Sequence, residues 1–440
     1  MTVELDGNFA PIETECAAQD LPVQGALPRE LNGTLFRNGP NPQFPSPTQH
    51  WFVGDGMIHA FTLADGRAGY SNRWVRTPKF VAERQAGRAL DVPDGGVANT
   101  NIVWHAGRLL ALEEAHAPIE IDPATLSTRG THALGGDGPV TAHPKIDPIT
   151  GALRFFGYAA AGPFSPAIRF GSVDRSGGVG QVATFDAPYC SMVHDFMATE
   201  HHVIFPIMPL AGSPERARDG MPFAWQPELG GYLGVMRLDT GIASLRWFRA
   251  ETCYVFHVMN AWEENGRILA DVMRYDEPPL FPRADGTPTD PARTRARPAR
   301  WTIDPAGGTD AFSSRPLDDL PGEFPRIDDR RAGLPYRHGW YAGSRGDSLD
   351  TIAHLDHASG RRTLLSLPAG DVTSEPVFVP RAPNAPEGDG WLLAVIWRGA
   401  EQRSDLVVLR ADAITDGPVA TIRLPQRVPF GFHGNWRDMP

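Results

Sequence analysis

The chain has 440 residues, of which 41% are hydrophobic and 21% are charged, a balance typical of a globular protein with a substantial core. Its net charge of -11 at neutral pH argues against a nucleic-acid partner, because phosphate binding favours a basic surface. Cys16, Cys190 and Cys253 are widely spaced and form no CxxC pair, which excludes a thiolate metal cluster and a disulfide framework. This cysteine usage fits a reducing compartment.

The N-terminal residues 1–11 are mainly acidic and polar, without the basic and then apolar pattern of a signal peptide. No window approaches the roughly 18 to 20 apolar residues that a transmembrane helix needs. We therefore expect a cytoplasmic protein without a transmembrane segment. Peripheral membrane contact and the oligomeric state stay open at this point.

Short runs rich in valine, isoleucine, phenylalanine and tryptophan follow one another along the chain. They are residues 33–36, 102–112, 153–158, 202–208, 232–238, 268–273, 391–397 and 405–409. Turn signals built on aspartate and glycine stand between or beside them, at residues 65–66, 137–138, 176–178, 239–241 and 389–390. Many short strands with this turn punctuation predict an all-β architecture.

Long helical periodicity is absent, and a β-propeller is the natural single-domain solution for an all-β chain of this length. We expect one propeller domain over residues 1–440, with divergent blades, because no WD or kelch repeat is present. Three stretches rich in proline, arginine and glycine read as insertions over one face of the propeller, residues 209–229, 275–300 and 380–388. Loops on a rigid scaffold commonly select the substrate.

Four of the 14 histidines stand out by their local setting, at the edges of predicted strands and beside small or aromatic residues. They are His143, His194, His257 and His433. Their wide separation places them on different blades, from which a propeller could direct all four to its axis. A set of neutral imidazoles suits iron, copper, zinc or nickel, and the spacing alone does not choose among these metals.

Several ordered motifs resemble one known family. They include Gly-Thr-Leu-Phe-Arg-Asn-Gly-Pro-Asn-Pro at residues 33–42, Gly-Asp-Gly-Met-Ile-His at 54–59, Glu-Phe-Pro-Arg-Ile-Asp at 323–328, Tyr-Arg-His-Gly at 336–339 and Glu-Pro-Val-Phe-Val-Pro-Arg at 375–381. With the settings of the four histidines, they resemble the carotenoid cleavage oxygenase family nearly from end to end. That family includes lignostilbene dioxygenases and the retinal-pigment-epithelium isomerases.

The resemblance implies a seven-bladed β-propeller in which a loop and helical dome over one face carries the substrate tunnel. It also implies one Fe(II) per chain, held by the four histidines, with O2 as the co-substrate. The expected partner is a small hydrophobic conjugated alkene, whose double bond is split into two carbonyl products. The substrate supplies the electrons, so no flavin, nicotinamide or other reductant is expected.

A metal-bound histidine normally donates its second ring N–H to a carboxylate or carbonyl group. The family uses three glutamates for this, which by motif correspond to Glu114, Glu323 and Glu375 and leave His143 without a glutamate. Glu113 stands directly before Glu114, so a shift of one residue stays open. Thr100, in turn, matches a family threonine whose methyl group lies near an open iron position, although a structural strand threonine is the alternative.

The substrate is the open question. Carotenoid-cleaving relatives often carry tryptophan immediately before the second-shell glutamate and lignostilbene-type relatives carry lysine, whereas this chain has Glu113. Its carboxylate could accept a hydrogen bond from a phenol. The segment 87–96 also lacks the tyrosine that the stilbene-cleaving relatives have there. The interpretation preferred on the sequence is therefore an apocarotenoid or similar polyene, and the alternative is a phenylpropanoid or stilbenoid alkene.

Three further hypotheses carry less weight. An isomerase of the same family would not cleave its substrate. A non-enzymatic propeller scaffold would contain no iron, and a zinc hydrolase would need a general base near the metal. These motifs offer no carboxylate that could act as such a general base.

Overall fold

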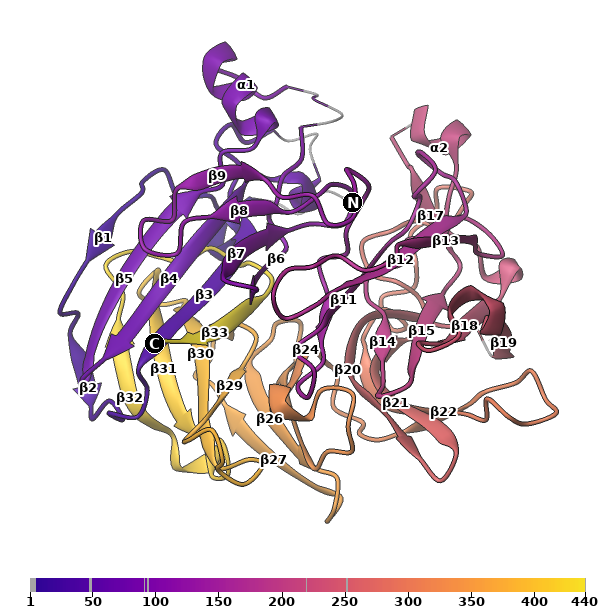
Figure 1. The fold of residues 1–440 in the computed structure, drawn as a ribbon. Coiled ribbons are helices and arrows are strands. Elements are labelled where there is room, and N and C mark those ends of the chain that lie inside the picture. Colours follow the sequence, from indigo (N-terminus) through magenta and orange to yellow (C-terminus); the bar gives the residue numbers. More distant parts are fainter. Residues whose placement is uncertain are drawn as a thin grey trace. The chain divides into compact units, whose positions relative to one another are not determined.

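The computed structural model describes residues 5–46, 50–90, 92, 95–218, 220–250 and 252–439. Residues 1–4 of the predicted N-terminal stretch, three positions of the segment 87–96 and one of the insertion 209–229 lie outside these ranges. Within them, the strands form seven antiparallel sheets of four or more strands and one two-stranded sheet (Figure 1). The prediction of an all-β chain is confirmed.

The described chain divides into two compact units. The first comprises Leu134–Glu323 and Asp329–Pro335, and the second comprises the rest. Three four-stranded sheets belong to the first unit. They contain β10 (Lys145–Ile146), β11 (Leu153–Gly157), β12 (Ala167–Val173) and β13 (Ala183–Asp186); β14 (Met197–Ala198), β15 (His202–Ile207), β18 (Gly231–Arg237) and β19 (Arg246–Ala250); and β20 (Tyr254–Glu264), β21 (Arg267–Tyr275), β22 (Arg297–Ile303) and β23 (Ser313–Pro316).

Two sheets of the second unit contain strands from both ends of the chain. One has the order β1 (Ala17–Ala18), β5 (Arg67–Trp74), β4 (Gly56–Ala64), β3 (Gly33–Pro40), β33 (Gly434–Asp438), and the other β2 (Val23–Gly25), β32 (Pro418–Arg423), β31 (Arg403–Arg410), β30 (Gly390–Arg398), β28 (Val372–Thr373), with β29 (Val377–Pro380) also on β30. The C-terminal strand β33 begins just after His433 and pairs with β3 from the N-terminal part of the chain. This pairing fixes the position of the C-terminal segment.

The other two sheets follow the chain order. They contain β6 (Asn101–His105), β7 (Arg108–Leu112), β8 (Ile119–Ile121) and β9 (Thr128–Thr131), and β24 (Gly322–Ile327), β25 (His338–Gly343), β26 (Thr351–Asp356) and β27 (Arg361–Ser366). The predicted run 102–112 is thus a hairpin, whose turn residues Ala106 and Gly107 both have positive φ. Asp65 and Gly66 also have positive φ, as a tight hairpin turn requires, and they join β4 to β5 as their dipeptide predicts.

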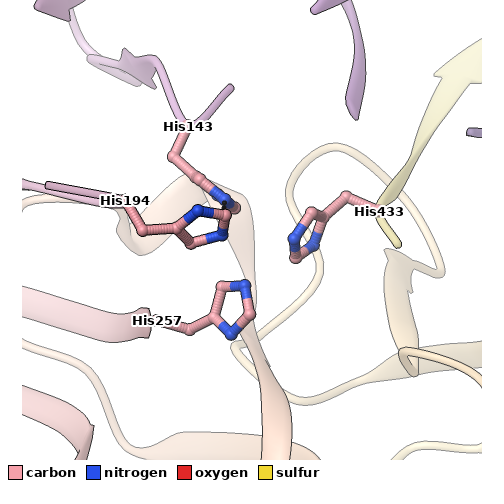
Figure 2. Close-up of side chains that lie close together, drawn as sticks. All are labelled: His143, His194, His257 and His433. Atoms are coloured by element: carbon pink, nitrogen blue, oxygen red, sulfur yellow. Dashed lines mark hydrogen bonds between the residues drawn. The ribbon is translucent and has the colours of Figure 1, made fainter. Parts of the chain in front are cut away.

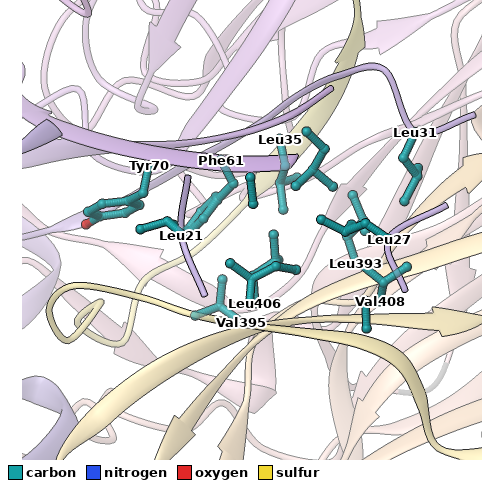
Figure 3. Packing of buried hydrophobic residues seen from close by; sticks show 14 of the residues in the cluster. Leu21, Leu27, Leu31, Leu35, Phe61, Tyr70, Leu393, Val395, Leu406 and Val408 are labelled. Atoms are coloured by element: carbon teal, nitrogen blue, oxygen red, sulfur yellow. The ribbon is translucent and has the colours of Figure 1, made fainter. Parts of the chain in front are cut away.

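Buried apolar side chains hold the sheets of each unit together. In the second unit, side chains of β3, β4 and β5 pack against those of β30 and β31 (Figure 3). Leu35, Phe61, Leu393 and Val408 are each at most 2% exposed in this cluster. Burial of this kind is worth about 25 cal/mol per Å² of apolar surface and is the main stabilisation of a sheet packed face to face. Phe156, Ile168 and Phe205 belong to the corresponding core of the first unit.

The described residues form few helices, namely α1 (Pro78–Ala86), α2 (Pro214–Arg218) and short 3-10 turns. Thr77 caps α1, because its hydroxyl oxygen accepts from the N–H of Phe80 at 3.2 Å. No helix within the described ranges is long and apolar enough to cross a membrane.

Little regular structure occurs in the three predicted insertions. In the first, β16 (Leu210–Gly212) and β17 (Phe223–Trp225) form the two-stranded sheet around α2. The second joins β21 to β22, and the third follows β29. The dome, the substrate tunnel and the single-domain organisation stay predictions.

Candidate metal centre

Two of the four histidines come from loops that lead into the first strand of a sheet in the first unit. His143 precedes β10, and its N–H donates to the hydroxyl oxygen of Thr141 at 2.9 Å. His194 precedes β14 in the same way. The two Nε2 atoms lie 3.0 Å apart, with ring centroids at 4.6 Å. Both rings therefore turn the same nitrogen toward a shared point.

His257 lies within β20 and not at its edge, which differs from the expectation. The pairing of β20 with β21 shifts register at Val255 and Val258, on either side of His257, so a bulge aims its side chain. Its ring centroid lies 5.2 Å from that of His143 and 5.1 Å from that of His194. The Nδ1 atom of His257 hydrogen-bonds to Glu323 Oε2 at 2.6 Å.

His433 directly precedes β33. Its N–H donates to the carbonyl oxygen of Thr100 at 3.1 Å, and its Nδ1 hydrogen-bonds to Glu375 Oε1 at 3.0 Å. Gly434 is required by a close approach of the backbone, since a Cβ there would lie 2.6 Å from the carbonyl oxygen of Phe36. The local sequence Phe-His-Gly-Asn therefore lets β33 pass close to β3 while it presents the imidazole.

The ligand atoms of the four histidines lie within 4.8 Å of one another, which is close enough for a single ion (Figure 2). Three of the rings are buried, and His194 is half-buried. Because the Nδ1 atoms of His257 and His433 each face a carboxylate, their Nε2 atoms are the natural metal donors. Imidazole donors of this kind suit a divalent first-row transition metal.

Different groups support the two carboxylates that contact His257 and His433. Glu323 Oε1 accepts a hydrogen bond from the Tyr275 hydroxyl at 2.7 Å. Glu375 Oε2 accepts from the N–H of Gly434 at 2.9 Å and lies 3.4 Å from Nη1 of Arg326. Burial raises the pKa of Glu375, but the charges of Arg326 and His433 and these hydrogen bonds lower it overall to about 2.

The remaining predicted residues lie at the end of β7 and before β6. Glu114 is half-buried. Glu113 is buried, its Oε2 accepts from the N–H of Val97 at 3.0 Å, and its Oε1 hydrogen-bonds to Nδ1 of His116. The hydroxyl of Thr100 donates to Asn99 Oδ1 at 2.9 Å.

Three of these groups were not predicted from the sequence, namely Tyr275, Arg326 and His116. Only His116 gave a local signal, since it follows Glu113 by three residues. Arg326 lies in the same motif as Glu323, but nothing in that motif predicts that Arg326 contacts Glu375.

The chain matches the family model for the retinal pigment epithelial membrane protein over residues 9–438. It belongs to the carotenoid cleavage oxygenase family. The isoeugenol monooxygenase of Pseudomonas putida is 39% identical over 467 residues, covering 99% of this chain and 98% of that protein. The lignostilbene-alpha,beta-dioxygenase isozyme III of Sphingomonas paucimobilis is 36% identical over 476 residues, with 99% and 97% covered.

Among solved structures, the lignostilbene dioxygenase of Pseudomonas brassicacearum matches with a TM-score of 0.95 and 34% identity, covering 99% of this chain and 98% of that one. The chain accordingly has the seven-bladed β-propeller fold of the family, as predicted. As a carotenoid cleavage oxygenase with a four-histidine metal site, it is an enzyme that cleaves a carbon–carbon double bond with O2.

Proposed function

We propose that this oxygenase holds Fe(II) on His143, His194, His257 and His433 and cleaves the side-chain double bond of a phenolic alkene, of the isoeugenol or lignostilbene type. The observation that carries the metal assignment is the convergence of four imidazoles within 4.8 Å. The substrate class is supported by the isoeugenol and lignostilbene activities for which the relatives above are named. These relatives favour the phenolic alternative over the apocarotenoid.

The donor set fits a divalent iron. Four neutral imidazoles leave the ion dipositive and leave room in its coordination shell. When bound, Fe(II) supplies the redox-active centre that activates O2. The overall reaction converts the alkene and one O2 into two carbonyl compounds, so a propenyl phenol yields an aromatic aldehyde and acetaldehyde.

The protein contributes the orientation of the metal site and of the alkene. Glu323 and Glu375 fix the tautomer and the plane of the two histidines that they contact, and Glu114 takes the same role for a further ligand. Thr100 is proposed to place its methyl group beside an open metal position. Its carbonyl group already accepts the N–H of His433, which ties this loop to a metal ligand.

Glu113 is proposed to recognise the phenolic end of the substrate. The backbone links it to the metal centre in two steps, since the carbonyl of Leu112 accepts from the N–H of Thr100 and the carbonyl of Thr100 accepts from the N–H of His433. A buried carboxylate bonded to an imidazole, as Glu113 is to His116, can accept a phenol proton that a hydrocarbon polyene does not offer.

The test is oxygen consumption with mass spectrometry of the products, on purified Fe(II)-reconstituted protein. The panel contains isoeugenol, a lignostilbene, resveratrol and an apocarotenal. We expect cleavage of at least one phenolic alkene. The isoeugenol analogue that lacks the hydroxyl group should be cleaved only poorly. Cleavage of the apocarotenal alone would overturn the phenolic assignment and restore the polyene.

A matched pair of variants tests the role of Glu113. Glu113→Gln keeps the shape of the side chain and the bond from Val97, but it removes the acidic acceptor. We expect it to raise KM for the phenolic substrate about tenfold and to leave the deoxygenated analogue unchanged, since a hydrogen bond to a charged group is worth about 1.5–3 kcal/mol. An equal loss for both substrates would show that Glu113 is only structural.

A further inference from the structure

The guanidinium group of Arg326 contacts three residues near His433, namely Glu375, Gly434 and Asn435. Its Nη1 donates to the carbonyl oxygen of Gly434 at 2.9 Å and lies 3.4 Å from Glu375 Oε2, and its Nη2 donates to Asn435 Oδ1 at 3.1 Å. The Arg326 side chain is 12% exposed and that of Glu375 is 4% exposed. The two charges therefore interact with little screening by water.

Both oxygens of Glu375 are in use. Oε1 hydrogen-bonds to Nδ1 of His433. Oε2 accepts a hydrogen bond from the N–H of Gly434 and forms an ion pair with Arg326. Because the contacts lie at both ends of the carboxylate, rotation of Glu375 would break at least one of them. Loss of Arg326 would also remove a charge that helps to compensate that of the buried carboxylate.

We propose that Arg326 is a positioning residue for metal binding: it anchors Glu375 and the first residues of β33, and so aims Nε2 of His433 at the metal. Arg326 acts through Glu375, Gly434 and Asn435. The inference rests on the proposed function, because it requires the four histidines to hold a metal.

The anchor extends to the neighbouring sheet. Asn435, which accepts from Arg326, donates through its Nδ2 to Asn101 Oδ1 at 3.0 Å and to the carbonyl oxygen of Ile102 at 2.9 Å. Asn101 directly follows Thr100, whose carbonyl accepts the N–H of His433. The arginine thus joins a network of hydrogen bonds and one ion pair around His433, and such networks can be worth more than their separate members.

The backbone before Arg326 is unusual. Phe324 has φ 57°, in the left-handed region that a bulky residue rarely adopts. In a regular strand, residues three apart point to opposite faces. The left-handed residue interrupts this alternation between Glu323 and Arg326, and the ring of Phe324 lies 5.4 Å from that of His433. Strain of this kind concentrates at functional sites, which agrees with a role for Arg326 there.

The experiment compares Co(II) affinity, measured by competition with a chromogenic chelator, in wild type, Arg326→Met, Arg326→Lys and Arg398→Met. Arg398 is the matched control. It pairs with the buried carboxylates Asp371 and Asp405, each at 2.8 Å, in the same compact unit. Its loss also breaks a buried ion pair, but the carboxylates that it pairs with are Asp371 and Asp405 and not Glu375.

We expect Arg326→Met to weaken Co(II) binding about tenfold, within the range for groups that orient metal ligands, and to shift the Co(II) absorption bands. Arg326→Lys keeps the charge without the forked geometry, and we expect it to recover part of the loss. Arg398→Met should bind Co(II) as wild type does. Affinity of Arg326→Met within twofold of wild type, or an equal loss in Arg398→Met, would overturn the proposal.

Should Arg326→Met fail to fold, Arg326→Lys decides the question alone. An affinity and an absorption spectrum identical to those of wild type would then overturn the positioning role. Failure of the wild-type protein itself to bind Co(II) is a different outcome, because it would overturn the proposed four-histidine metal site and not only the part of Arg326.

Discussion

Two of the candidate metal ligands are supported in chemically different ways. In one arrangement, the His257 branch, the imidazole bonds to Glu323 and the carboxylate accepts a hydrogen bond from Tyr275. The partner is a neutral phenol, and its pKa is raised by burial and by the nearby carboxylate. In this branch, the contacts described for Glu323 are with an imidazole and with a phenol hydroxyl.

In the other arrangement, the His433 branch, the imidazole bonds to Glu375 and a cation, Arg326, lies against the carboxylate. Loss of a phenol and loss of a guanidinium ion should therefore differ in energetic cost. A neutral hydrogen bond can be lost at modest cost, whereas a buried ion that loses its partner is left uncompensated. Glu323 and Glu375 each bond to a histidine, but their other partners differ in charge. We therefore expect the same substitution to have unequal effects at the two positions.

The largest expected effect is shared by both branches. His257→Ala and His433→Ala should each abolish activity and reduce bound metal to a small fraction of the wild-type content, because each removes a donor from the four-histidine group. Metal analysis and circular dichroism check this result, and the spectrum should show a largely intact fold. Full activity in either variant would remove that histidine from the proposed ligand set.

Substitution of the carboxylates should separate the branches. Glu375→Gln removes the buried negative charge that lies 3.4 Å from the Arg326 guanidinium, and we expect it to lower the free energy of unfolding by about 3 kcal/mol. Glu323→Gln should cost only about 1 kcal/mol, because it replaces hydrogen bonds to neutral groups. Urea denaturation of the metal-free proteins measures both values. Equal losses would erase the proposed distinction between the branches.

Acid should affect the sheet of the His433 branch. His59 in β4 pairs with Arg37 in β3, which also pairs with Gly434 in β33. Burial, and then the charges of Arg37 and Arg427, lower the pKa of His59 to about 3. The folded protein therefore keeps this imidazole neutral at pH values at which the unfolded chain has already taken up the proton.

Since the folded pKa lies below the unfolded value of about 6.5, the stabilisation is present above pH 6.5 and is lost progressively as the pH falls toward 3. Between pH 6.5 and pH 5 the loss from His59 should be about 2 kcal/mol. Denaturation of wild type and His59→Gln across this range measures it. A pH dependence that is the same in both proteins would contradict the assignment.

The smallest expected effect belongs to the phenol of the His257 branch. Tyr275→Phe removes one neutral donor to Glu323, so metal affinity should fall only about fivefold, equivalent to about 1 kcal/mol. Chelator competition measures this change, and Tyr254→Phe is a suitable control in the same strand pair. A loss of metal affinity as large as that of Arg326→Met would show that Tyr275 and Arg326 contribute equally to metal binding.

Much of the architecture could be predicted from the sequence. Apolar runs separated by aspartate–glycine turns determine where strands begin and end, since φ > 0 at a tight turn selects few residue types. The four histidines were identified by local motifs, and the structure brings their nitrogen atoms together. Motifs also identified Glu323 and Glu375, whose hydrogen bonds to His257 and His433 the structure provides.

Other features were decided only by the tertiary structure. No sequence pattern distinguishes a glutamate that Tyr275 supports from one that Arg326 supports, because these partners are far from their carboxylates in the chain. Their contacts depend on strand register, on the bulge at His257 and on the left-handed Phe324. Sequence periodicity reports which face of a strand is buried, whereas the partner of a buried charge depends on where other strands place their side chains.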